Sequence, residues 1–205
     1  MKRLSIFTAG LLVVAFALVG CSSQPSGSGW VTLIDGGKGL ENFNRIGDAN
    51  WRAEGGAVVA DKGKGGHLVT KESYKDYEIY AEFYAETSTN SGIFMRASDP
   101  KNIGSATSYE VNIYDLRPGQ EYATAAIVDF ASVPVPIIYK AGGRWNTFEI
   151  YAKGPEMTVK FNGAVTASLR NDKFASGPFS LQFANGPKDA PGGVIKWRKV
   201  MIKPL

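Results

Sequence analysis

The residues best suited to chemistry lie in the run Glu110-Val111-Asn112-Ile113-Tyr114. In an extended chain, side chains two positions apart project from the same side, so the carboxylate, the amide and the phenol ring of this run would share one face. A carboxylate and an amide can bind sugar hydroxyls, and an aromatic ring can stack on a pyranose. The run therefore indicates a carbohydrate site, although a strand face that is polar only because water covers it has the same composition.

Three further residues could extend such a site. Gln182 would add a second amide, Tyr84 a second ring, and Arg96 a cation if the stretch Phe94-Met95-Arg96 pairs with the first run. The sequence has no nucleophile elbow, no phosphate-binding glycine loop and no metal-ligand spacing. With one histidine and one cysteine, a Cys/His zinc cluster is excluded, and we expect His67 to be a structural residue at a strand edge or in a loop. We expect no metal and no cofactor, and nothing in the sequence indicates calcium.

These side chains require β-strands to position them. Apolar and polar residues alternate in short runs between Gly, Pro, Asn and Asp, and no long stretch has a helical period. We expect strands at 77–85, 108–114, 145–151, 157–161, 164–167, 179–183 and 194–203. Asn162-Gly163 predicts a two-residue hairpin turn, whereas Pro134 and Pro136 predict a loop or edge segment. Because a single sheet would leave an apolar face in water, the sequence predicts an all-β fold of two packed sheets.

Length and composition set the broad class. A chain of 205 residues with 44% hydrophobic content can bury one sizeable core and is not disordered throughout. No linker or repeat interrupts residues 30–205, which we expect to form one domain. The net charge of +4 falls to two positive charges once Lys2 and Arg3 are set aside, which argues against a nucleic-acid partner.

The N-terminus has the features of an export signal. Lys2 and Arg3 precede an uncharged apolar stretch at 4–20, which as an alternative could be a retained membrane anchor. Leu18-Val19-Gly20-Cys21 resembles the lipobox of bacterial lipoproteins, in which the cysteine is acylated and becomes the first mature residue. We therefore expect a signal peptide at 1–20, lipidation of Cys21, a flexible Ser/Gly-rich linker at 21–29 and attachment to a membrane of the cell envelope. Ser22 resembles the signal for the outer membrane in a cell with two membranes.

Ordered blocks along the chain resemble the 3-keto-disaccharide hydrolase domain family, and the resemblance covers nearly all of the chain after the linker. The blocks are Gly29-Trp30-Val31-Thr32-Leu33-Ile34-Asp35-Gly36, Trp51-Arg52-Ala53-Glu54-Gly55-Gly56, the stretch 68–78, Asn90-Ser91-Gly92-Ile93-Phe94-Met95-Arg96, Tyr109-Glu110-Val111-Asn112-Ile113, Trp145-Asn146-Thr147-Phe148-Glu149-Ile150, Asn162-Gly163 and Ile202-Lys203-Pro204-Leu205.

The resemblance implies a fold and a reaction. The fold would be a concanavalin A-like jelly roll, two curved antiparallel sheets with carbohydrate on the concave side. The reaction would be cleavage of disaccharides or glycosides that are oxidised at C3 of the sugar. A ketone at C3 acidifies the hydrogen on C2, so a base can expel the glycosidic oxygen from C1 before water adds. By position in the matching blocks, Glu110 would be the base and Arg96 the cation that stabilises the enolate.

The chain also departs from the family pattern. Asn112 stands where the family often has Gln, and Leu181-Gln182-Phe183-Ala184-Asn185-Gly186 lacks the histidine of the corresponding family stretch. The missing histidine favours an alternative function, a lectin-like lipoprotein that binds carbohydrate without cleaving it. A third alternative is a structural envelope lipoprotein whose Tyr80, Tyr84 and Tyr114 contact another protein.

Overall fold

The structure, a computed structural model, describes residues 24–205. The expected signal peptide at 1–20 and the expected lipidation site Cys21 lie outside the described residues. Within the described part of the chain, no helix has both the length and the apolar character needed to cross a membrane.

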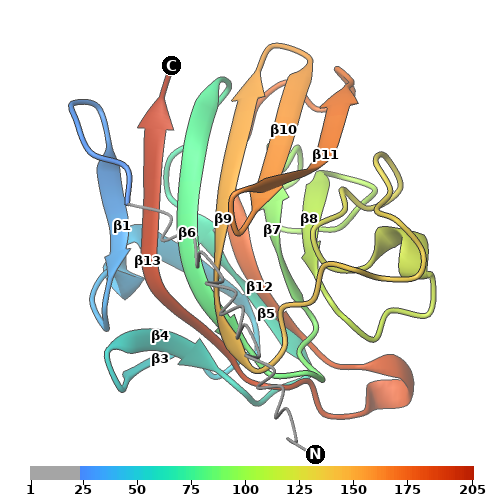
Figure 1. Ribbon diagram of the computed structural model, residues 1–205. Helices are drawn as coiled ribbons and strands as arrows, with labels where there is room; N and C mark the ends of the chain where they lie inside the picture. Colours follow the sequence, from blue (N-terminus) through green and yellow to red (C-terminus); the bar gives the residue numbers. More distant parts are fainter. Residues whose placement is uncertain (1–23) are drawn as a thin grey trace, which may run out of the picture.

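Two antiparallel sheets form the molecule and confirm the predicted all-β sandwich (Figure 1). The first is eight-stranded, in the order β11 (Ala164–Arg170), β10 (Glu156–Phe161), β9 (Arg144–Lys153), β6 (Tyr77–Ala85), β13 (Ile195–Pro204), β4 (Ala57–Ala60) and β3 (Arg52–Glu54), with β1 (Val31–Asp35) also paired to β13. The second is five-stranded, in the order β2 (Phe43–Gly47), β5 (Gly65–Thr70), β12 (Ser180–Ala184), β7 (Ser91–Met95) and β8 (Tyr109–Ile113). Short 3₁₀ turns occur at Leu40–Asn42, Gln120–Tyr122 and Pro187–Asp189.

The core lies between the two sheets and is rich in aromatic residues. Phe83 of β6 stacks on Phe148 of β9 with ring centroids 5.0 Å apart, and Trp197 of β13 lies 5.5 Å from Phe83. Val111 and Leu181 of the five-stranded sheet belong to the same buried cluster. Each such side chain contributes about 1.5–3 kcal/mol through burial, and this packing fixes which face of each sheet points outward.

The turn chemistry read from the sequence is confirmed. Asn162 and Gly163 join β10 to β11 with φ values of 49° and 83°, the positive values that a two-residue hairpin turn requires. Pro134 and Pro136 lie in no strand, as their missing amide hydrogens predicted.

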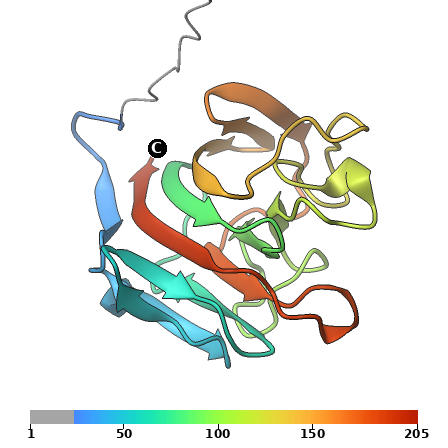
Figure 2. The ribbon, with the colours of Figure 1, turned by 60° about the horizontal axis from the view of Figure 1, so that its bottom comes forward.

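The last strand of the five-stranded sheet is covered along its outer edge. Three hydrogen bonds along this edge join backbone groups. The Asn112 N–H donates to the Ala126 carbonyl at 3.0 Å, and the Ala125 N–H donates to the Asn112 carbonyl at 2.9 Å. The Val128 N–H donates to the Glu110 carbonyl at 2.9 Å. The loops of residues 114–143 gather on this side of the sandwich (Figure 2). Strand β8 is therefore held on both sides, which fixes the side chains that it carries.

Candidate active site

Strand pairing brings four of the predicted site residues to one surface, the outer face of the five-stranded sheet. Between β7 and β8, Phe94 pairs with Glu110 and Gly92 with Asn112. Between β12 and β7, Ser180 pairs with Phe94 and Leu181 with Ile93, so Gln182 stands beside Gly92. Tyr114 continues the alternation of β8 beyond its end and is buried. Because Val111 and Leu181 fill the core, Glu110, Asn112, Tyr114 and Gln182 face away from it.

The Glu110 carboxyl has an unusual environment. Its residue is only 9% exposed, and no hydrogen bond or ion pair to its side chain occurs within residues 24–205. Burial raises the pKa of Glu110 from 4.5 to about 7, the positive charge of Arg117 lowers it, and the negative charge of Asp129 raises it. At neutral pH this carboxyl therefore exists in both protonation states, which suits a group that takes up and returns a proton.

Polar atoms without hydrogen-bond partners lie on the same face of the sheet as this carboxyl. The Asn112 Nδ2 donates to the Tyr122 carbonyl at 2.6 Å, but the Asn112 Oδ1 has no partner. The Gln182 Oε1 and the Tyr114 hydroxyl are also buried without a partner. A buried polar group without a hydrogen bond costs about 1–3 kcal/mol, and a ligand with several hydroxyl groups would remove that cost.

Gly92 lies between Asn112 and Gln182 in the sheet, and because it has no side chain it leaves space between their two side-chain amides. A Cβ at this position would lie 3.4 Å from both the Cγ and the Oε1 of Glu110 and 3.0 Å from the Val111 carbonyl oxygen. A methyl group at position 92 would therefore press on the Val111 carbonyl oxygen and fill the space beside the Glu110 carboxyl, which the glycine leaves open.

His67 also lies on this face, which the sequence reasoning missed. It pairs with Gln182 within the sheet, so its expected place at a strand edge or in a loop was wrong. Its Nδ1 lies 3.1 Å from the Ser180 Oγ, and its ring meets Phe94 edge-on with centroids 5.1 Å apart. Burial lowers the pKa of His67 to about 4, so the imidazole is neutral at neutral pH. The sequence signal that could have placed His67 on this face is its position next to the core residue Leu68, because neighbouring side chains in a strand point to opposite faces.

Arg96 is not brought to Glu110. The strand ends at Met95, and Arg96 takes a left-handed backbone conformation with φ of 53°, which breaks the alternation. Its guanidinium donates to the carbonyl oxygens of Lys75 at 2.9 Å, Gly154 at 2.8 Å and Phe174 at 3.4 Å, and lies 3.5 Å from the Asp76 carboxylate. Only 1% of Arg96 is exposed. These contacts tie three chain segments together and give Arg96 a structural role in place of the expected catalytic one.

The cation whose charge acts on Glu110 is Arg117, in the loop after β8, which the sequence did not single out. Tyr84, expected as a second ring of the site, lies on the outer face of the other sheet. Its ring is 5.9 Å from that of Trp145 and 5.3 Å from the Lys196 Nζ. Tyr84 is therefore separated from Glu110 by the whole core.

Over residues 24–205, no group of three or more His, Cys, Asp or Glu side chains could hold a metal ion.

Comparisons with solved structures find the same fold in carbohydrate-related proteins. A 2.00 Å crystal structure of a candidate glycosyl hydrolase from Parabacteroides distasonis matches with a TM-score of 0.68 and 23% identity, over 86% of this chain and 99% of that one. Carbohydrate-binding module CBM66 from Bacillus subtilis matches with a TM-score of 0.55 and 13% identity, over 85% and 95% of the two chains. Winged bean acidic lectin, solved with methyl-α-D-galactose, matches with a TM-score of 0.60 and 12% identity, over 84% and 96%. These likenesses establish a shared fold.

No curated protein sequence matches the chain. A family model does, over residues 29–203, which span both sheets and every residue of the outer face described above. The function is therefore carbohydrate-related, and the chain belongs to the family of 3-keto-alpha-glucoside-1,2-lyase-like domains.

Proposed function

We propose that the protein cleaves 3-keto-glycosides, 3-keto-disaccharides among them, at the outer face of the five-stranded sheet with Glu110 as the base. The observation that carries this proposal is the buried Glu110 carboxyl, which has no hydrogen bond within the described chain and a pKa raised by burial to about 7. A carboxylate with a raised pKa is a stronger base than one in water, and it remains partly ionised at neutral pH.

The reaction follows from the chemistry of the oxidised sugar. The Glu110 carboxylate removes the proton from C2, and the electron pair of the C–H bond forms an enolate whose charge rests on the C3 oxygen. The enolate then expels the oxygen on C1, which leaves with a proton that the Glu110 carboxyl can return. Water adds to the resulting C1–C2 double bond and gives the free 3-keto sugar.

Neighbouring groups would assist in two ways. Arg117 supplies positive charge near Glu110, which opposes the negative charge that develops on the enolate. The Asn112 Oδ1 and the Gln182 Oε1 can accept hydrogen bonds from sugar hydroxyls, since neither has a donor in the protein. His67 is neutral at this pH and adds no charge.

The test is incubation of the protein with a 3-keto-disaccharide and measurement of the released monosaccharide. Glu110→Gln should lower kcat by about 10²–10⁴-fold, the usual contribution of a general base. The matched control is Glu82→Gln, a buried carboxylate on the other sheet, which should stay within about twofold of the unaltered protein. Cleavage by Glu110→Gln at the unaltered rate would reject Glu110 as the base.

The pH dependence gives a second readout. Because the base must be ionised, kcat/KM should rise with pH and level off above about 7, where the Glu110 carboxyl has lost its proton. A rate that is highest near pH 4 and falls at neutral pH would contradict the assignment.

Binding without cleavage is the second candidate function. Phe183-Ala184 occupies the place of a histidine in the family stretch, and a carbohydrate-binding module and a lectin share the fold. Calorimetry that shows binding of a 3-keto-disaccharide, with no monosaccharide released over many hours, would favour this candidate over cleavage.

We further propose that the domain is attached to the cell envelope through an acylated Cys21, on the strength of the lipobox-like sequence that precedes it. Labelling of cells with a tagged palmitate should mark the protein, and Cys21→Ser should abolish the label and release the domain from membranes. Equal labelling of the variant would reject the anchor.

A further inference from the structure

A pocket of about 440 Å³ lies on the outer face of the eight-stranded sheet, on the opposite side of the core from Glu110. This volume falls within the range of small-molecule sites, about 300–1,000 Å³. Its lining consists of Pro25, Trp30, Glu78, Ile79, Tyr80, Glu149, Ile150, Tyr151, Thr158 and Lys160. The proposed cleavage uses none of these residues.

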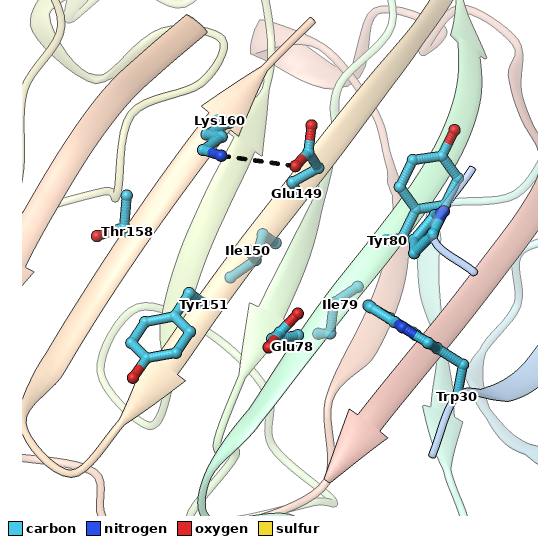
Figure 3. A pocket seen from close by; sticks show the side chains of 10 residues that line it. Trp30, Glu78, Ile79, Tyr80, Glu149, Ile150, Tyr151, Thr158 and Lys160 are labelled. Carbon is cyan, nitrogen blue, oxygen red and sulfur yellow. Dashed lines mark ion pairs between the residues drawn. The ribbon is translucent and has the colours of Figure 1, made fainter. Parts of the chain in front are cut away.

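Strand pairing explains the shape of the pocket. Strands β6 and β9 place Glu78 opposite Tyr151 and Tyr80 opposite Glu149, and the floor between the outer rings holds the Glu78 and Glu149 carboxylates. Trp30, from the segment before β1, stands on one side of β6, and Tyr151 of β9 stands on the other (Figure 3). Tyr151 is 37% exposed, so an aromatic surface remains available in the hollow. Two aromatic rings on either side of a polar floor can hold a sugar ring by its apolar faces.

The charges in the pocket are balanced. The Glu149 carboxylate lies 3.7 Å from the Lys160 Nζ (Figure 3), and the Glu78 carboxylate lies 3.7 Å from the Lys203 Nζ. Each acid therefore has a base beside it, and a charged ligand would gain little. The carboxylates, the amines and the Thr158 hydroxyl can still form hydrogen bonds with a neutral ligand that carries many hydroxyl groups.

The segment expected to be a flexible linker forms part of this surface. Pro25 lines the pocket, and the Gln24 Nε2 donates to the Glu82 Oε1 at 2.9 Å. The Tyr80 hydroxyl and the Arg198 Nε also donate to the Glu82 carboxylate, at 2.7 Å and 2.6 Å. Gln24 and Pro25 are thus held against the sheet beside the pocket.

We propose that this pocket is a second carbohydrate site, which binds neutral, unoxidised glycosides between Trp30 and Tyr151 without cleaving them. It would hold the protein on a glycan while the Glu110 face acts on a separate, oxidised substrate. The proposal does not depend on cleavage at Glu110, because the two surfaces share no residue.

The test is a titration of the full-length protein with maltose, cellobiose, sucrose and trehalose, followed by two-dimensional NMR. The Trp30 indole N–H signal should shift in a saturable way with at least one of these sugars. The same shift should persist in Glu110→Gln, since that carboxyl lies on the other sheet. Tyr151→Ala should weaken the affinity by about tenfold, which corresponds to about 1.4 kcal/mol.

Two variants control for indirect effects. Tyr151→Phe keeps the ring and should bind nearly as well, and Val165→Ala changes an exposed residue on the neighbouring strand β11 and should bind unchanged. No shift with any of the four sugars would overturn the proposal. Shifts that disappear in Glu110→Gln and persist in Tyr151→Ala would also overturn it, because they would place the only sugar site on the five-stranded sheet. If the protein does not cleave 3-keto-disaccharides but the sugars still shift the Trp30 signal, the proposed cleavage is rejected and the second carbohydrate site is supported.

Discussion

The two outer faces of the sandwich treat their polar groups in opposite ways. On the five-stranded sheet, the Glu110 carboxyl and the Asn112 and Gln182 amide oxygens are largely removed from water and lack partners in the described chain. On the eight-stranded sheet, the carboxylates are paired: Glu82 with Arg198 at 2.6 Å, Glu149 with Lys160 and Glu78 with Lys203. The unpaired groups of the five-stranded sheet can still bind or react with a ligand, whereas the ion pairs of the eight-stranded sheet leave that surface close to neutral.

The pKa values express the same difference. Burial raises the pKa of Glu110, and no hydrogen bond opposes it. Burial also acts on Glu82, but hydrogen bonds from Tyr80, Arg198 and Gln24 outweigh it and lower the pKa of Glu82. Two carboxyls of similar burial therefore differ in charge at neutral pH because only one of them has donors.

The largest expected effect concerns two arginines that differ in burial, Arg96 after β7 and Arg198 on the outer face of the eight-stranded sheet. Arg96→Ala should lower the free energy of unfolding by about 3–5 kcal/mol, because it leaves the Lys75 and Gly154 carbonyls without their donor. Arg198→Ala, at a 46% exposed side chain, should cost at most about 1 kcal/mol. Urea denaturation measures both. Equal losses in the free energy of unfolding would show that the difference in burial between Arg96 and Arg198 does not determine their contributions to stability.

The next effect is the pH dependence of stability. The folded-state pKa of Glu110 lies above its usual value of 4.5, so the folded protein binds more protons, and stability falls as pH rises from about 4.5 to about 7. Glu110→Gln removes this loss. The variant should therefore gain about 3 kcal/mol relative to the unaltered protein between pH 4 and pH 8. Thermal unfolding across this range measures the gain, and Glu82→Gln should show none.

A smaller effect should follow from filling the space above β7. Gly92→Ala fills the space beside the Glu110 carboxyl with a methyl group, which lies only 3.0 Å from the Val111 carbonyl oxygen. Because the methyl group takes up room that the proposed substrate needs, kcat/KM should fall by about tenfold, equivalent to about 1.4 kcal/mol. Gly104→Ala is the control, since a Cβ there meets nothing within 4 Å. If the two alanine variants cleave 3-keto-disaccharide equally well, the space at Gly92 has no part in substrate binding.

The smallest effect is the coupling between Glu82 and Arg198. A double-mutant cycle with Glu82→Gln and Arg198→Ala should give about 0.5–1 kcal/mol, because the guanidinium is half exposed and also stacks 4.2 Å from the centre of the Trp145 ring. High salt should reduce the coupling. A coupling above about 3 kcal/mol would mean that this pair behaves as a buried one.

Local sequence patterns predicted strands β6 and β8 to β13, but not the strands β1 to β5 and β7. The alternation at 77–85 matches β6 residue for residue, and the expected strand at 108–114 contains β8. Alternation works because it depends only on the two-residue period of an extended chain. It also placed Glu110, Asn112 and Tyr114 on one face correctly.

Which strands become neighbours could not be read in this way. Tyr84 and Glu110 both lie on polar faces, but of different sheets, and only long-range pairing decides this. Arg96 was misplaced because its positive φ turns the chain after β7, a change of direction that no residue pattern announced. His67 was set aside because no second histidine and no neighbouring acid stands beside it in the sequence, and its pairing with Gln182 is visible only in the folded sheet.

The covered edge of β8 has a consequence for adaptation. The loops after β8, one of which forms that cover, carry both charges that act on the Glu110 pKa, Arg117 with a lowering effect and Asp129, which is exposed, with a raising one. Replacing Arg117 by a neutral residue would raise the pKa of Glu110, and replacing Asp129 by a neutral residue would lower it. Under the proposed cleavage, the working pH could thus be adjusted during evolution through these two loop residues, with Glu110, Asn112 and Gln182 left in place.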